Sequence, residues 1–224
     1  MAETQVATHH ESAIASTNKV LRNTYLLLSM TLLFSAAMAG VAIMIDAPYL
    51  GLLALVGFIG LFFAVHKTQN SVWGLIWTFA LTGFMGFTLG PIINMYLATA
   101  NGASIVMQAM GLTGLIFFSL SGYVLVTKKD FSFMGGFLFT GLMVVIGAVL
   151  LMWGASFFGY YMSGAHLAIS SAIVLLMSGF ILYDTSRIIN GGETNYIMAT
   201  VSLYVSIYNL FTSLLHLLGA LGDE

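Results

Sequence analysis

The sequence predicts an all-α membrane protein with seven transmembrane helices. Of its 224 residues, 59% are hydrophobic and only 6% are charged, which is far more apolar than an average soluble domain. The apolar residues gather in runs of about twenty residues, the length that a helix needs to cross a bilayer. Strands of an outer-membrane barrel would instead alternate apolar and polar residues over about ten residues.

Short polar breaks separate the predicted spans, and no soluble domain fits between them. The spans cover about residues 25–45, 49–65, 72–97, 103–126, 131–154, 165–189 and 196–218. Residues 1–23 are polar and have no apolar period, which is typical of a mobile tail. We therefore expect a mobile cytoplasmic tail over residues 1–23, a single seven-helix domain over residues 24–219 and a short tail over residues 220–224.

The positive charges all fall on one side of this seven-span topology. They are Lys19, Arg22, Lys67, Lys128, Lys129 and Arg187. Because loops that carry Lys and Arg stay in the cytoplasm, the amino terminus is predicted to be cytoplasmic and the carboxyl terminus periplasmic.

Composition also excludes several classes of function. The net charge of -2 and the absence of a basic patch argue against nucleic-acid binding. The chain has no Cys, which excludes disulfides and thiolate chemistry. Ser156 is expected in an outer loop, only ten residues before His166, rather than on a helix opposite it, so an intramembrane serine protease is not expected. We expect no catalytic residue, no metal and no cofactor.

Residues 180–211 join the last two spans through a polar bend and contain Asp184, an acidic residue inside an apolar run. A carboxylate at mid-helix costs about 2.5–3.5 kcal/mol and less toward the ends, so a partner or protonation is expected. Arg187 follows three residues later on the same helix face and is the nearest candidate. Three interpretations remain open: a structural latch, a proton- or ion-linked switch, and neutral packing.

The last span carries a stripe of polar side chains at spacings of four, three, four and three residues. Its members are Ser202, Ser206, Asn209, Ser213 and His216. Such spacing places them on one helix face, which must meet protein or water because hydrocarbon offers polar atoms no partners. The last helix is therefore predicted to be central. The polar side chains of the stripe could find their partners either in hydrogen bonds to other helices or in a water-filled path beside the stripe.

The third span combines small residues with a proline. Gly83, Gly86 and Gly90 leave one face open to close backbone approach, and Pro91 removes the hydrogen bond to the carbonyl of Phe87. The pattern indicates either tight helix packing with a tolerated kink or a hinge.

Several longer strings resemble a known family. They are GFTLGPII at residues 86–93, LYDT at residues 182–185 and SLYVSIYNLF at residues 202–211. With them, the chain from about residue 19 to residue 219 resembles the Bax inhibitor-1 family of seven-helix membrane proteins. KVLRNTY at residues 19–25 and GGETNY at residues 191–196 look like the bacterial branch described as modulators of FtsH, the membrane-anchored ATP-dependent protease.

This resemblance implies six helices wrapped around a central seventh. It also implies an inner-membrane regulator that binds FtsH and restrains its proteolysis of membrane proteins, without catalysis of its own. The family's channel-like members pair the aspartate that matches Asp184 with a basic residue ending helix 2, a position near His66 or Lys67 here.

The resemblance implies a second activity, a pH-responsive calcium or proton leak gated by two aspartates. Asp184 matches the first aspartate, whereas the second position falls on Ser206. One carboxylate beside a hydroxyl cannot share a proton as a carboxylate pair does, and it makes a poor calcium ligand set. We therefore place the leak, with Asp184 as its titrating group, below the regulation of FtsH.

Overall fold

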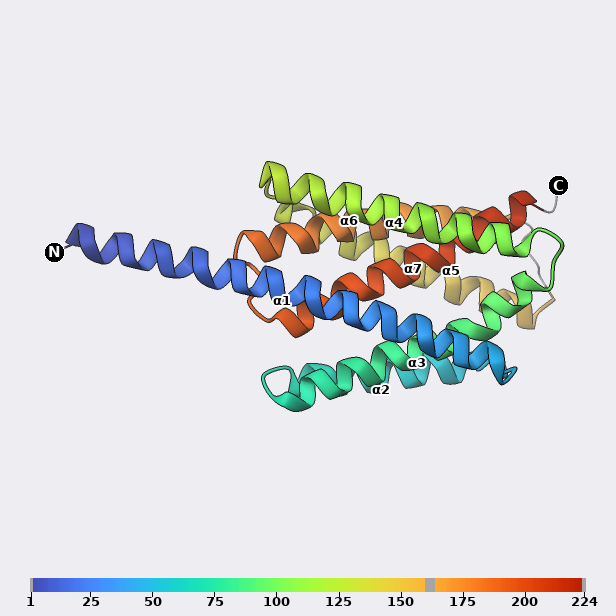
Figure 1. Cartoon of the computed structure of the whole chain (residues 1–224). Coiled ribbons are helices and arrows are strands. Elements are labelled where there is room, and N and C mark those ends of the chain that lie inside the picture. Colours follow the sequence, from blue (N-terminus) through green and yellow to red (C-terminus); the bar gives the residue numbers. More distant parts are fainter. Residues whose placement is uncertain (1, 160–163, 223–224) are drawn as a thin grey trace. The chain divides into compact units, whose positions relative to one another are not determined.

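The computed structural model describes residues 2–159 and 164–222, with side chains from residue 16 onward except that of Phe157. Over this part of the chain the structure is helical and has no strand. Figure 1 shows the helices α1 (Ala2–Met44), α2 (Leu52–Thr68), α3 (Val72–Leu97), α4 (Gly102–Thr127), α5 (Gly135–Phe157), α6 (Ala165–Ile189) and α7 (Tyr196–Gly222). A short 3-10 helix, η1 (Ser132–Met134), precedes α5.

These helices confirm the predicted all-α membrane fold. Within the described residues, 6 helices are long and apolar enough to cross a membrane. The remaining apolar helix, α2, has 17 residues, and a rise of about 1.5 Å per residue makes it slightly shorter than the hydrocarbon layer. The predicted spans at residues 72–97 and 165–189 coincide with α3 and α6.

Helix α1 begins well before the predicted first span. Its apolar run starts near Tyr25, but the helix itself starts at Ala2 (Figure 1). The lack of an apolar period excludes a membrane span in residues 2–15, yet Ala, Glu and Gln form helices readily without one. The mobility expected of residues 1–23 stays a prediction.

The chain forms two compact units. Unit 1 contains residues 1–94 and 187–204, and unit 2 contains residues 95–186 and 205–224. Helices α6 and α7 each contribute to both units, so neither unit is a continuous piece of chain. The single domain over residues 24–219 stays a prediction.

In unit 1, α3 lies close to α1 because glycines remove side chains from the contact. A Cβ atom on Gly86 would meet the carbonyl oxygen of Ser35. A Cβ atom on Gly90 would lie 2.8 Å from the carbonyl oxygen of Ala39. Only glycine lets the two backbones come this near.

In unit 2, α5 and α6 pack in a similar way. A Cβ atom on Gly141 would lie 2.6 Å from Leu176, and one on Gly179 would lie 2.6 Å from Leu138. These contacts involve the ends of leucine side chains, which can shift, rather than backbone atoms.

Helix α7 is one of the two most buried spans. Half of its most apolar window is buried, the same share as in α3, whereas the share in α5 is 11%. The central position expected of the last helix stays a prediction.

Candidate functional site

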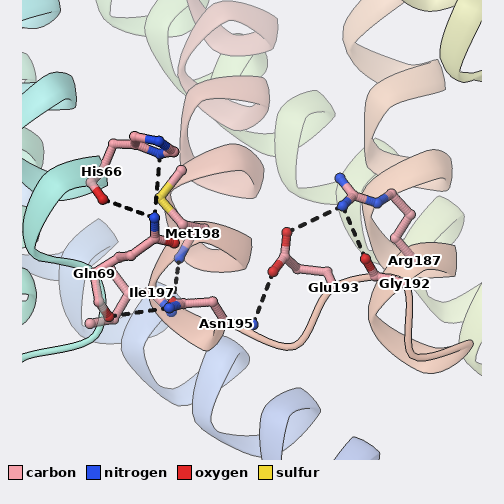
Figure 2. Close-up of polar contacts among 8 residues, drawn as sticks. All are labelled: His66, Gln69, Arg187, Gly192, Glu193, Asn195, Ile197 and Met198. Atoms are coloured by element: carbon pink, nitrogen blue, oxygen red, sulfur yellow. Dashed lines mark hydrogen bonds and ion pairs between the residues drawn. The ribbon is translucent and has the colours of Figure 1, made fainter.

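The bend between α6 and α7 is held by the side chain of Arg187. Its Nη2 atom donates to the carbonyl oxygen of Gly192 at 3.1 Å and lies 3.4 Å from Oε2 of Glu193. The other carboxylate oxygen of Glu193 accepts the backbone N–H of Asn195 at 2.9 Å (Figure 2). Both charged side chains are partly exposed, so the ion pair adds at most about 1 kcal/mol to stability. Its main effect is to fix the path of the bend.

Asn195 connects this bend to two other elements. Its Oδ1 atom caps α7 by accepting the backbone N–H groups of Ile197 at 2.9 Å and Met198 at 3.2 Å. Its Nδ2 atom donates to the carbonyl oxygen of Gln69 at 3.2 Å and to Oδ1 of Asn70 at 2.9 Å. The α6–α7 bend, the start of α7 and the α2–α3 loop therefore share one side chain (Figure 2). We call Gln69, Asn70, Arg187, Gly192, Glu193 and Asn195 the bend network.

His66 and Lys67 end α2 beside this network, and both are exposed. Nε2 of Gln69 donates to the carbonyl oxygen of His66 at 2.8 Å and lies 3.5 Å from its Nδ1 atom (Figure 2). The sequence alone did not single out Gln69 or Asn195 as site residues. The available signal was an Asn directly before an apolar helical run, which is typical of an N-cap.

Asp184 lies on the part of α6 that belongs to unit 2 and is only 5% exposed. It is engaged in a polar or electrostatic contact. Thr185 and Ser186, the next two residues, are fully buried, and Oγ1 of Thr185 donates to Oγ of Ser121 on α4 at 3.3 Å. The carboxylate thus sits in a buried polar stretch of α6. A latch between Asp184 and Arg187, His66 or Lys67 stays a prediction.

The stripe on α7 is buried only in part. Ser206 and Ser213 are each 4% exposed, Ser202 and Asn209 are half-buried, and His216 is exposed. Asn209 donates to the carbonyl oxygen of Val205 in its own helix at 2.8 Å. The most buried polar positions of the stripe are therefore Ser206 and Ser213.

Tyr204, which sequence reasoning did not single out, makes two long-range polar contacts from α7. Its side chain is 1% exposed, and its hydroxyl donates to the carbonyl oxygen of Thr82 at 3.1 Å. Oγ of Ser35 lies 2.6 Å from the same hydroxyl. A tyrosine has one hydroxyl proton, so Ser35 is the donor in that bond. Within unit 1, this junction joins α1, α3 and α7 directly beside Gly86, with Gly90 and the buried Pro91 further along α3.

The loop between α4 and η1 docks on α6. The backbone N–H of Phe131 donates to Oγ of Ser186 at 2.8 Å, and Ser186 donates to Oδ1 of Asp130 at 3.3 Å. Hydrogen bonds from the side chain and the backbone of Ser132 hold the pKa of Asp130 below its ordinary value. The carboxylate therefore stays charged at neutral pH.

Among the described residues, no three His, Asp or Glu side chains lie close enough together to hold a metal ion. Ser156 lies in the last turn of α5, so its expected position in an outer loop is wrong. It donates to the carbonyl oxygen of Trp153 at 2.6 Å, and His166 is exposed. The side chains of His9 and His10 lie outside the described ones.

The α-helices of the described residues, 6 of which are long and apolar enough to cross a membrane, define a multi-pass α-helical membrane protein. A family profile described as "Inhibitor of apoptosis-promoting Bax1" matches residues 17–223. The chain belongs to the Bax inhibitor-1 family.

Curated relatives match nearly the whole chain. An uncharacterized protein of Pseudomonas aeruginosa is 54% identical over 217 residues, which cover 95% of this chain and 96% of that protein. An uncharacterized membrane protein of Vibrio cholerae is 55% identical over 211 residues, which cover 93% of this chain and 92% of that protein. The protein named modulator of FtsH protease YccA, from Escherichia coli strain K12, is 52% identical over 215 residues, covering 95% of each chain.

Proposed function

We propose that this protein is an inner-membrane regulator that binds the ATP-dependent protease FtsH and restrains its proteolysis of membrane proteins. The observation that carries the proposal is the end-to-end similarity to the modulator of FtsH protease YccA, at 52% identity over 95% of each chain. A relative with the same coverage is named inner membrane protein YccA. The role requires no catalysis, cofactor or metal.

In this proposal the amino terminus is cytoplasmic and the carboxyl terminus is periplasmic. The six Lys and Arg residues support this orientation, because all of them lie before or between spans on the amino-terminal side. Residues 2–15 of α1 precede its apolar part and would project into the cytoplasm. An ATP-driven protease would engage the chain at that segment and begin to pull it from the membrane there.

The packing of the spans supplies a means of restraint. Glycine contacts between α1 and α3, and the buried hydroxyl junction at Tyr204, make the helices costly to separate. Asp184 adds to this cohesion as a latch, with Arg187, His66 or Lys67 as its basic partner. A protease that engages the amino-terminal segment would then be occupied by a slow extraction.

Capture of FtsH is the direct test. The tagged full-length protein, solubilised from membranes, is expected to copurify FtsH and to slow degradation of a membrane substrate by purified FtsH. Absence of FtsH from the eluate, together with an unchanged degradation rate, would refute the proposal. An unrelated seven-helix protein of similar expression level serves as the control.

The same preparation discriminates the alternative, a pH-responsive calcium or proton leak with Asp184 as the titrating group. The low exposure of Asp184 is compatible with either function. Reconstituted vesicles are expected to show no flux above protein-free vesicles at either mildly acidic or mildly alkaline pH. Flux that is lost in Asp184→Asn, without capture of FtsH, would establish the leak instead.

Deleting residues 2–15 is expected to lengthen the half-life of the protein in cells that contain FtsH. The reason is that proteases start at accessible chain ends, and the deletion removes the segment that precedes the first span. Half-life is measured by blocking synthesis and blotting. Removal of Asp223 and Glu224, at the predicted periplasmic end, is the control and should change nothing. An unchanged half-life in the amino-terminal deletion would contradict the role of this segment.

A further inference from the structure

The loop after α4 must lie at the membrane surface. It joins two candidate spans, Gly102–Thr127 and Ser132–Ser156, through residues 128–131 alone. A connection this short cannot leave the headgroup layer between two membrane-crossing helices. Lys128 and Lys129 are both exposed there.

This loop is held in one shape by its own hydrogen bonds. Lys128 adopts the left-handed conformation (φ 53°), and its N–H donates to the carbonyl oxygen of Val124 at 2.8 Å, which closes α4. The docking of Phe131 and Asp130 on Ser186, described above, fixes the other end. The two lysines therefore leave a rigid turn rather than a flexible one.

A chain of neighbouring aromatic rings lies beside Lys129. The ring centroids of Tyr123 and Phe131 are 6.2 Å apart, and those of Phe131 and Phe133 are 6.4 Å apart. Nζ of Lys129 donates to the hydroxyl of Tyr123 at 2.9 Å and lies 5.5 Å from the centroid of its ring. Phe133 is 80% exposed. We call Tyr123, Lys128, Lys129, Phe131 and Phe133 the aromatic–lysine cluster.

The charges of the cluster favour an anion. The hydrogen bond to Tyr123 raises the pKa of Lys129, so its ammonium group stays protonated. One of its three N–H donors is used by Tyr123, which leaves two, and Lys128 is exposed beside it. Asp130 is ionised, but its Oδ1 atom already accepts from Ser132 and Ser186. The turn that contains the cluster carries Lys128, Lys129 and Asp130, so its net charge is +1.

We propose that the aromatic–lysine cluster binds the phosphate group of an anionic phospholipid. Ammonium groups at the headgroup level attract anionic lipids, and aromatic rings beside them settle at the boundary with the acyl chains. A soluble phosphate would meet the same two ammonium groups but would gain nothing from the exposed ring of Phe133. The combination of charge and exposed ring on one rigid turn therefore favours the lipid as the source of the phosphate.

Native mass spectrometry of the full-length protein in detergent tests this site. The protein is titrated separately with phosphatidylglycerol, phosphatidylcholine and inorganic phosphate, and the apparent affinity of the first adduct is compared. Phosphatidylglycerol is expected to bind most tightly. Lys128→Gln with Lys129→Gln should weaken that adduct by about fivefold per lysine and leave phosphatidylcholine unchanged.

Lys19→Gln with Arg22→Gln is the matched control, because it removes two exposed positive charges from a different helix, α1. Retained phosphatidylglycerol affinity in the Lys128 and Lys129 variant would overturn the proposal. An equal loss in the control variant would overturn it as well, since overall charge would then explain the binding. Tighter binding of inorganic phosphate would assign the site to a soluble anion. Thermal unfolding of each variant confirms that these exposed substitutions leave the fold intact.

Discussion

Gly86→Ala is expected to destabilise the protein by about 1–3 kcal/mol, the usual cost of forcing an extra methyl group into a packed contact. The new Cβ atom would meet the carbonyl oxygen of Ser35 and lie 2.6 Å from its Oγ atom. A backbone oxygen cannot rotate away as a side chain can, so α1 and α3 must separate. The midpoint of thermal unfolding in detergent measures the loss.

Gly40→Ala is the matched control, because it makes the same chemical change on α1 with nothing within 4 Å of the new atom. Its midpoint should stay unchanged or rise, since alanine favours helix by about 1 kcal/mol over glycine. Adding Ser35→Ala to Gly86→Ala removes the hydroxyl but leaves the carbonyl oxygen in place, so little recovery is expected. Equal midpoints for Gly86→Ala and Gly40→Ala would show that the close approach does not limit stability.

Asn195→Ala should be the most damaging single change in the bend network. It removes the cap on α7, worth about 1 kcal/mol, and two donated bonds to the α2–α3 loop, worth about 1 kcal/mol each. We expect a loss of roughly 2–3 kcal/mol in total. Hydrogen exchange followed by mass spectrometry should show faster exchange in the first turn of α7, where Ile197 and Met198 lose their acceptor.

Asn195→Asp separates the two contributions. The carboxylate keeps the cap, but it has no N–H to donate to Gln69 or Asn70. Exchange in the first turn of α7 should therefore stay slow, while exchange in the α2–α3 loop rises. Thr194→Ala changes the exposed neighbouring residue and serves as the control. Fast exchange in both segments of Asn195→Asp would indicate that the cap and the loop contacts cannot be separated.

The hydropathy of the sequence was sufficient to locate the apolar helices. Each of them needs an apolar run to cross the hydrocarbon layer, and this requirement does not depend on which helices lie beside it. The spans at residues 72–97 and 165–189 illustrate this, since α3 and α6 have the same bounds. The helical start of α1 could not be found in this way, because residues 2–15 are polar and their helix has no apolar face to reveal it. Glycine spacing on α3 indicated a close approach, but not that α1 would be its partner.

The polar junctions were harder to predict because their partners are distant in the chain. Tyr204 reads as one aromatic residue in an apolar run, and its hydroxyl finds Thr82 and Ser35 at separations of 122 and 169 residues. Asn195 gives a local cap signal, whereas its partners Gln69 and Asn70 lie 126 and 125 residues away. A single sequence carries no trace of such pairings.

The discontinuous make-up of unit 1 has a consequence for biosynthesis. Residues 1–94 leave the ribosome first, yet the residues that complete their unit, 187–204, arrive only after residues 95–186 have been made. Until then the hydroxyl of Ser35 lacks the tyrosine that accepts its proton, and the α2–α3 loop lacks the amide of Asn195. A chain whose synthesis stops before α7 would expose these polar groups within and beside the bilayer. The unsatisfied hydrogen-bonding groups of such a fragment would make it less stable than the finished chain and would distinguish the two.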